Sequence, residues 1–282
     1  MTSDQARGGN ALLDKLRRGE LVTAMMIRSA RTPDVVRIAA STGHGCIIVD
    51  LEHSAMSLDV VAQMTAVAHD LGLAPFVRVP ERDYGSIGRV LDGGACGIVA
   101  ARIETAEQAR DVARACRFAP RGQRSQIAMV PQLGFRPTPA RELNPLLDRA
   151  IVVQILIETP LGIANADAIA AVDGVDMLAI GANDLSAELG APGDFRNPAL
   201  REAVAQVAMA CRRHGKLCVL GGISDLGIVA DLTPLGVAPL MMSGSDVDLL
   251  FSAARSRVET LGRWHAELPG AVPVPYTTPK KA

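Results

Sequence analysis

Aromatic residues are scarce in this chain, which contains 3% of them and a single Trp among 282 residues. A hydrophobic core must therefore be built from Val, Ile, Leu, Ala and Met, and the hydrophobic content of 49% supplies enough of them. Only 21% of the residues are charged. A chain of this composition can bury a large core, so extensive disorder is not expected.

Cysteine pairs and an excess of one charge are also missing. The five Cys form no C-x-x-C pair, which argues against a disulfide framework and against a structural zinc site. Cys46, Cys96 and Cys218 lie in apolar runs, and we expect them to be small core residues. Basic and acidic residues almost cancel, 29 against 30, and no basic stripe with interleaved aromatics occurs. We therefore expect no nucleic-acid partner.

Long apolar segments do not occur either. The first residues, MTSDQARGGN, contain no apolar signal region, and no uninterrupted apolar run reaches the length that spans a membrane. We therefore expect no membrane partner and a cytoplasmic location.

Short β-rich apolar runs, by contrast, recur along the whole chain and predict strands. They cover residues 21–27, 46–51, 74–79, 96–101, 150–157, 176–180, 216–220 and 238–242. Most of them are continuous apolar runs and do not alternate with polar residues, which is typical of parallel strands buried on both faces.

Amphipathic segments between these runs predict helices. The segment SLDVVAQMTAVAHDLG, for example, begins at Ser57, a suitable N-cap, and ends at Gly72. Eight strands alternating with helices predict an α/β fold of the (β/α)8 TIM-barrel type, as one domain over residues 1–265. An open, doubly wound sheet is the alternative; a G-x-G-x-x-G motif after the first strand would favour it, and none is present. The Pro-rich segment 266–282 is expected to be extended or disordered.

One interval, 101–150, is about twice as long as the others. It contains a helix, the segment 119–137 with Arg121 and Arg124 around Gly122, and a second short helix. Long loops in compact domains are usually functional or disordered. A surface excursion or a subunit contact is as well supported here as a direct role in substrate binding.

Polar residues follow several predicted strands, where the active sites of barrels of this kind lie. Asp50, Glu52 and His53 follow the second strand, Arg78 lies in the third, and Glu158 ends the fifth, with Asn183 and Asp184 after the sixth. A charge is rarely placed in an apolar run unless it is paired or functional. Taken together at one face of a barrel, these residues indicate an active site.

The residue types indicate a particular chemistry. Two carboxylates on different strands, Glu158 and Asp184, suit a hard divalent cation such as Mg²⁺. Arg78 suits bidentate capture of a substrate carboxylate, and His53 next to Asp50 suits a general base. This set fits proton abstraction next to a carbonyl, and the absence of Lys from the strand ends disfavours a Schiff base.

Each residue also has a structural alternative. Glu158 could favour a helix start, and Asp184 could be an N-cap. Arg78 could form a structural salt bridge with Glu52 or Glu81, and His53 could be a histidine of a surface loop. Gly221 and Gly222 after the seventh strand, with Ser243–Ser245 after the eighth, could bind a phosphate of the acceptor. Turn glycines and a Ser N-cap for the last helix are the favoured interpretation of these residues.

An ordered set of motifs over about residues 10–265 resembles the HpcH/HpaI aldolase/citrate lyase family. The motifs are VDLEHS, FVRVP, TAEQAR, APRGQRS, ILIETPLGIAN and IGANDLSAELG. The chain is similar in particular to the metal-dependent class II pyruvate aldolases, such as 4-hydroxy-2-oxoheptanedioate aldolase. The resemblance implies a barrel whose last helix packs on, or is exchanged with, a neighbouring subunit in a homo-oligomer, usually a hexamer built as a trimer of dimers. It also implies a Mg²⁺, Mn²⁺ or Co²⁺ ion that binds pyruvate enolate.

Carried over position by position, the resemblance implies a role for each site residue. Glu158 and Asp184 would hold the metal, and Arg78 would hold the pyruvate carboxylate. His53 would be the acid/base, oriented by Asp50. The backbone around Asn183 and Asp184 would donate to the substrate carboxylate, whereas Glu52 receives no role beyond support of the site.

Two positions depart from the family pattern, and both concern the acceptor half of the site. Many relatives have GPADLS where this chain has GANDLS, so Asn183 adds a polar side chain beside the metal. Relatives often have Gln at the position of Leu156.

The sequence therefore predicts a class II aldolase. It would cleave 4-hydroxy-2-oxo acids to pyruvate, or a close analogue such as hydroxypyruvate, and an aldehyde. The alternatives are a citrate lyase β-like enzyme or an oxaloacetate decarboxylase that uses the same enolate, and a non-catalytic assembly barrel.

Overall fold

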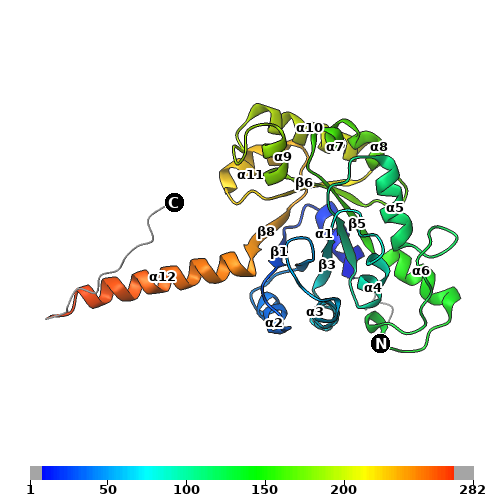
Figure 1. The fold of residues 1–282 in the computed structure, drawn as a ribbon, viewed down its shortest axis with the longest axis horizontal. Helices are drawn as coiled ribbons and strands as arrows, with labels where there is room; N and C mark the ends of the chain where they lie inside the picture. Colours follow the sequence, from blue (N-terminus) through cyan, green and yellow to red (C-terminus); the bar gives the residue numbers. More distant parts are fainter. Residues whose placement is uncertain (1–7, 270–282) are drawn as a thin grey trace.

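Parallel strands form one eight-stranded ring in the order β7-β6-β5-β4-β3-β2-β1-β8 (Figure 1). The computed structural model describes residues 8–269. The strands are β1 Val22–Ile27, β2 Cys46–Asp50, β3 Ala74–Val79, β4 Gly97–Ala100, β5 Val152–Ile157, β6 Met177–Gly181, β7 Leu217–Gly221 and β8 Leu240–Ser245. The first strand, β1, pairs with the last, β8, and a bridge from Cys218 of β7 to Val237 brings the two ends of the sheet together, so the barrel is nearly closed. The predicted (β/α)8 barrel is confirmed, and the open sheet is excluded.

The last gap of the ring, between β7 and β8, has no continuous ladder. A single bridge joins Cys218 of β7 to Val237, just before β8. All eight strands begin within two residues of their predicted starts, and the largest difference is at the end of β8, which lies three residues beyond the predicted one. This strand runs on through Ser243–Ser245, so these residues belong to the strand and do not follow it.

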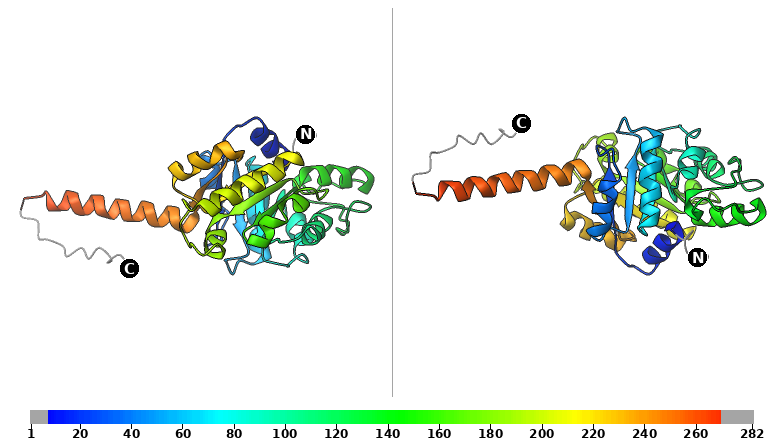
Figure 2. Two further views of the ribbon diagram at one scale, coloured as in Figure 1. Left: turned by 90° about the horizontal axis from the view of Figure 1, so that it is seen from above. Right: turned by 90° about the horizontal axis from the view of Figure 1, so that it is seen from below.

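Helices connect the strands and surround the ring (Figures 1 and 2). They are α1 Gly8–Arg17, α2 Asp34–Ser41, α3 Leu58–Asp70, α4 Ile87–Asp92, α5 Ala106–Cys116, α6 Ala140–Ala150, α7 Pro160–Ala164, α8 Ala166–Ala170, α9 Ala182–Glu188, α10 Pro198–Arg213, α11 Leu226–Leu232 and α12 Asp246–Ala266, with short 3₁₀ turns η1 Pro131–Leu133 and η2 Thr233–Leu235. Ser57 caps α3 through its side chain, as predicted. Within residues 8–269, no helix combines the length and the apolar character needed to cross a membrane.

The core has two layers because successive strand residues point to opposite faces. Residues such as Ile48 and Phe76 belong to an inner cluster that fills the barrel, and Leu12, Leu13 and Leu16 of α1 join it. The alternate residues of the same strands pack outward against the helices. All five Cys are free and buried, which confirms the prediction that Cys46, Cys96 and Cys218 are small core residues.

Gly97 shows how closely the barrel interior is packed. A Cβ at this position would lie 2.3 Å from the ring of Phe76 on the neighbouring strand. Phe76 is fully buried, and it occupies space that any larger residue at 97 would need. This contact of an aromatic ring therefore requires the smallest residue, Gly97, on the neighbouring strand.

The long interval 101–150 is folded as an excursion with a small core of its own. After α5, the chain forms a bridge between Phe118 and Arg124 and then η1 and α6. Phe118, Leu143 and Leu147 form part of a separate buried cluster there. Arg124 is buried, pairs with Asp92 at 2.7 Å and lies over the Phe118 ring at 4.6 Å. The Arg124 charge is therefore paired with Asp92 and is not available to a substrate, which favours a surface excursion over a direct role in substrate binding.

The last helix, α12, projects away from the barrel (Figures 1 and 2). Ser245 begins it with a reciprocal capping box to Asp248, which confirms the predicted Ser N-cap. None of its residues is buried, although Leu250, Phe251 and Trp264 are large and apolar. The predicted tail, 266–282, starts at its end and lies outside the described residues from 270 onward.

Candidate active site

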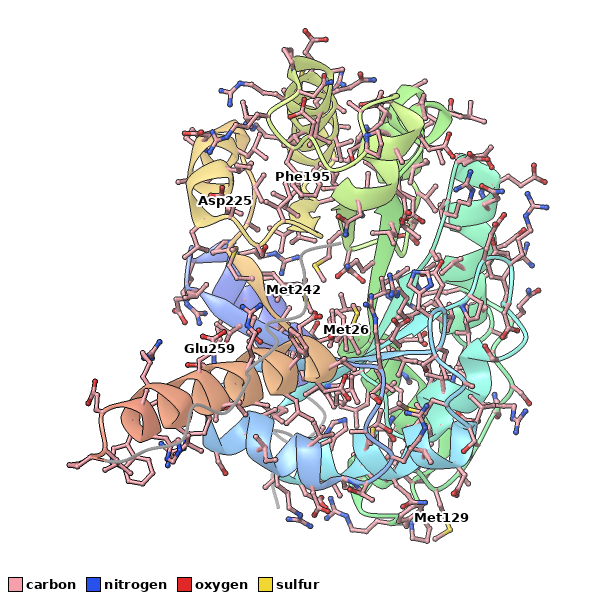
Figure 3. The ribbon with its side chains drawn as sticks, turned by 60° about the vertical axis from the view of Figure 1, so that its left-hand side comes forward. Met26, Met129, Phe195, Asp225, Met242 and Glu259 are labelled. Atoms are coloured by element: carbon pink, nitrogen blue, oxygen red, sulfur yellow. The ribbon has the colours of Figure 1, made fainter. Side chains whose placement is uncertain are left out.

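The carboxyl ends of the strands surround a cavity of about 330 Å³. Four of the predicted residues line it, and they come from three separate segments of the sequence: Arg78, Glu158, and the neighbouring Asn183 and Asp184. Met26 of β1 and Met242 of β8 form part of the apolar wall near the base of α12 (Figure 3). The fold thus brings together the polar residues of strand ends three, five and six, whereas Asp50 lies behind Arg78 and His53 does not line the cavity.

Glu158 lies directly after β5 and is almost fully buried. Burial raises its pKa to about 7, and the negative charges of Glu52 and Asp184 act in the same direction. The backbone N–H of Arg102 donates to Glu158 Oε1 at 2.8 Å, which only partly offsets this. A carboxylate in such a place needs a nearby positive charge to stay ionised at neutral pH.

This environment fits a divalent cation. Three carboxylates influence one another across the barrel mouth, and hard cations prefer oxygen ligands of this kind. Within residues 8–269, no group of three or more His, Cys, Asp or Glu is arranged as a closed metal cage. An ion held by two carboxylates, with its remaining positions left to water or substrate, needs no such cage. Glu158 and Asp184 would hold it.

Gly181 makes room for the Glu158 carboxylate. It lies at the end of β6, and a Cβ there would be 2.6 Å from Glu158 Oε2. The backbone at Gly181 has φ of −83°, a conformation that any residue can adopt. The requirement for Gly is therefore the close approach of the carboxylate.

Asp50 is the centre of a buried ion network. Its carboxylate is fully buried and accepts from Arg78 Nε at 2.9 Å and from Arg78 Nη2 at 2.6 Å. Arg28 Nε donates to the same group at 2.8 Å. Burial alone would raise the pKa of Asp50, but the hydrogen bonds and charge of Arg78 and the hydrogen bond of Arg28 lower it to about 2. Asp50 therefore carries its charge throughout the physiological range.

His53 is placed differently from its expected arrangement. Asp50 Oδ1 accepts the backbone N–H of His53 at 3.3 Å, while the imidazole Nε2 lies 3.7 Å from Glu52 Oε2. The expectation that Asp50 orients the His53 ring is therefore not met, because the Asp50 oxygens are occupied by two arginines and by loop amides. The His53 side chain is 53% exposed.

Glu52, which had no predicted role beyond support of the site, lies between Arg78 and His53. Its carboxylate is 3.2 Å from Arg78 Nη1 and close to the His53 ring. The proposed structural pairing of Arg78 with Glu52 is thus present alongside the bidentate pair with Asp50.

Two residues at this face were missed by the sequence argument, although the same strand-end rule could have found them. Arg28 follows β1 and lines the cavity. Arg102 follows β4 and has a left-handed backbone, with φ of 50°, which aims its N–H at Glu158. Its side chain pairs instead with Glu188, at 2.8 Å.

The glycines and serines at strand ends seven and eight have structural roles. Gly222 has φ of 89°, which is the conformation of a turn glycine, and Ser245 caps α12. Both still line the cavity.

The barrel carries acidic side chains and arginines together at the carboxyl ends of its strands. The chain belongs to the HpcH/HpaI aldolase/citrate lyase family, whose model matches residues 23–226. The predicted family is thus confirmed.

Three comparisons describe the likeness. The chain is 42% identical to the 4-hydroxy-4-methyl-2-oxoglutarate aldolase of Hapsidospora irregularis over 216 residues, which is 76% of this chain and 80% of the relative. It is 30% identical to the hydroxypyruvate/pyruvate aldolase of Roseovarius nubinhibens, over 83% of this chain and 89% of the relative. The crystal structure of an HpcH/HpaI aldolase from Desulfitobacterium hafniense superimposes with a TM-score of 0.83 at 30% identity, covering 93% of this chain and 99% of that one.

These relatives are aldolases, and the predicted class of activity, a carbon–carbon lyase, is confirmed. The names of these relatives give less support to the alternative of a citrate lyase β-like enzyme. The family generally depends on a divalent metal ion.

Proposed function

We propose that this chain cleaves 4-hydroxy-2-oxo acids into pyruvate, or hydroxypyruvate, and a second carbonyl compound, with a divalent ion held by Glu158 and Asp184. The observation that carries the proposal is the buried Glu158 carboxylate, which faces the cavity beside two further acids and opposite Arg78. The names of the relatives support the substrate class. Mg²⁺, Mn²⁺ and Co²⁺ are the candidate ions.

The ion would act as a Lewis acid toward the negative charge that develops on the 2-oxo group during cleavage. Arg78 would bind the substrate carboxylate through Nη1, which would exchange its ion pair with Glu52 at 3.2 Å for the substrate, while Nε and Nη2 stay directed to Asp50. The rigid pairing with Asp50 keeps this guanidinium in one orientation, which suits planar recognition of a carboxylate. The backbone at Asn183 and Asp184, in the first turn of α9, would add donors to the same carboxylate.

His53 would move the proton. Cleavage requires a base for the 4-hydroxyl proton and an acid for the methyl carbon of the released pyruvate, and an imidazole can serve as both. The exposed position of His53 allows it to approach the cavity when substrate is bound.

Metal removal tests the proposal. We expect the purified chain to release pyruvate from 4-hydroxy-2-oxo acids, followed by coupling to lactate dehydrogenase, and to lose at least about 10³-fold in rate after chelation with EDTA, because Lewis-acid catalysis contributes several kcal/mol. Dialysis followed by Mg²⁺, Mn²⁺ or Co²⁺ should restore the rate. Cleavage that persists in metal-free enzyme would contradict the proposal.

We also propose that the chain forms a homo-oligomer in which α12 packs on a neighbouring subunit, in a hexamer arranged as a trimer of dimers. The exposed Leu250, Phe251 and Trp264 support this, because an apolar helix surface of this size is rarely left in water. Light scattering should give the mass of a hexamer for the full chain. Aspartate at 250 and 251 should lower that mass, and a monomeric full chain would refute the proposal.

A further inference from the structure

Arg28 and Arg78 both line the cavity, but their guanidinium groups are engaged to different extents. Arg78 directs Nε and Nη2 to Asp50 and places Nη1 3.2 Å from Glu52. Arg28 uses only Nε, which donates to Asp50 at 2.8 Å. Among residues 8–269, no acceptor forms a hydrogen bond with its Nη1 or Nη2. The two terminal amino groups of Arg28 are therefore available to a ligand.

Arg28 is also held in place. The backbone N–H groups of residues 28, 29 and 30 all donate to the Asp246 carboxylate, at 3.0, 3.0 and 2.6 Å. The side chain is anchored at Nε and is 38% exposed. A cation that is fixed before the ligand arrives loses little conformational entropy on binding it.

The position of Arg28 in the ring separates it from the candidate metal ligands. Glu158 follows β5 and Asp184 follows β6, whereas Arg28 follows β1, between β8 and β2. A substrate bound at Glu158 and Asp184 would extend across the cavity toward β1. The walls near this end contribute neutral polar groups from Ser243 and Ser245.

Acidic groups near Arg28 are already engaged. Asp50 is shared with Arg78, and Asp246 holds backbone amides. Asp248 lines the cavity but accepts from the hydroxyl and the backbone N–H of Ser245. The hydrogen bonds of Ser245 lower the pKa of Asp248 and the charge of Arg28 contributes to this, but among the described residues none of these carboxylates accepts a hydrogen bond from Arg28 Nη1 or Nη2.

We propose that Arg28 binds a carboxylate on the acceptor half of the substrate, so that the chain selects 4-hydroxy-2-oxo dicarboxylates that yield pyruvate and a second 2-oxo acid. The inference rests on the proposed function and deepens it. In such a substrate the bond between C3 and C4 breaks. The 4-hydroxyl loses its proton and becomes the carbonyl of the second oxo acid, and the electron pair passes to C3, which is protonated to the methyl group of pyruvate. No oxidant or reductant is needed.

Two inert acids of equal chain length isolate the contact in a binding experiment. 2-Oxoglutarate carries a second carboxylate at C5, and 2-oxovalerate carries a methyl group there; neither has the 4-hydroxyl needed for cleavage. Calorimetric titration of the full-length chain with Mg²⁺ should show tighter binding of 2-oxoglutarate. In Arg28→Gln that acid should bind about 10- to 100-fold more weakly, which is the range for hydrogen bonds to charged groups, and 2-oxovalerate should bind unchanged.

Arg141→Gln is the control, because it removes a charge from an exposed side chain that pairs with Glu142 and does not line the cavity. It should leave both affinities within about two-fold, as expected for an exposed charge. Equal weakening of both acids in Arg28→Gln would overturn the proposal, since Arg28 would then act on the shared 2-oxo acid half. Equal affinity of the unaltered chain for the two acids would also overturn it.

Cleavage assays separate this inference from the proposed function. For 4-hydroxy-4-methyl-2-oxoglutarate, Arg28→Gln should lower kcat/KM by about 10- to 100-fold, whereas 4-hydroxy-2-oxovalerate should be cleaved as before. If Arg28→Gln cleaves both substrates as fast as the unaltered chain, the proposed function stands and the inference about Arg28 is wrong. If the unaltered chain binds 2-oxoglutarate more tightly through Arg28 but cleaves neither substrate, the carboxylate site stands and the proposed function is wrong.

Discussion

Glu158→Gln is expected to abolish metal-dependent pyruvate release, with a loss of at least about 10³-fold in rate. The amide has the same shape but carries no charge, so one of the two proposed cation ligands is lost along with the Lewis acid it holds. Pyruvate formation coupled to lactate dehydrogenase measures the rate, and calorimetry with Mn²⁺ measures metal affinity. The metal-free variant should keep its melting temperature, because the substitution removes a charge that burial and two neighbouring acids disfavour. Full activity with unchanged Mn²⁺ affinity would contradict this assignment.

Two matched variants distinguish the loss of the cation from other defects. Gly181→Ala keeps Glu158 but forces its carboxylate to move, since the new Cβ would lie 2.6 Å from Oε2. Metal affinity should fall while the fold is retained, because the displaced group is the end of a side chain. His53→Ala should instead keep metal affinity and slow the exchange of pyruvate methyl protons in deuterated water by about 10²- to 10⁴-fold.

Asp50→Ala is expected to lower the free energy of unfolding by about 3–5 kcal/mol, because it leaves the buried Arg78 without its bidentate partner. Arg28 loses its anchor at the same time. Urea denaturation followed by circular dichroism measures the change. Asp173→Ala is the control, since it removes an acid from an exposed ion pair with Arg121 and should cost less than about 1 kcal/mol. A loss below about 1 kcal/mol in Asp50→Ala would refute the structural role of the network.

The pH dependence of this contribution follows from the lowered pKa of Asp50, about 2 in the folded chain against an ordinary value of 3.8. A carboxyl whose pKa is depressed by folding stabilises the native state above its unfolded pKa. That stabilisation is lost as the pH falls through the folded value. The difference in stability between the unaltered chain and Asp50→Ala should therefore be constant from neutral pH to about pH 4, and it should shrink between about pH 4 and pH 2.

The barrel and the face that carries the site could be predicted from the sequence because both depend on local patterns. Continuous apolar runs indicate parallel strands buried on both faces, and in a barrel all their carboxyl ends meet at one rim. A residue such as Glu158 or Arg78 is thus assigned to the cavity by its place at the end of a run. Arg28 and Arg102 obey the same rule at strands one and four.

The pairing of these residues depended on the tertiary structure. Asp50 is three residues from His53 in sequence, yet its carboxylate binds arginines of β3 and of the segment after β1, because those strands flank β2 in the ring. The raised pKa of Glu158 likewise arises first from its burial in the assembled barrel, and then from the charges of Glu52 in the loop after β2 and Asp184 in α9. The excursion at 101–150 buries Arg124 against Asp92, a contact that its own sequence does not indicate.

The sequence by itself determined which residue types reach the barrel mouth, since strand period and apolar length decide where each strand ends. The tertiary structure alone decided which of the charged side chains pair with one another and which remain available to bind a ligand. Charge pairing acts over a few ångströms between segments far apart in the chain, and it depends on side-chain geometry that no local pattern encodes. For this reason Arg78 is committed to Asp50, whereas the terminal amino groups of Arg28 stay free for a ligand.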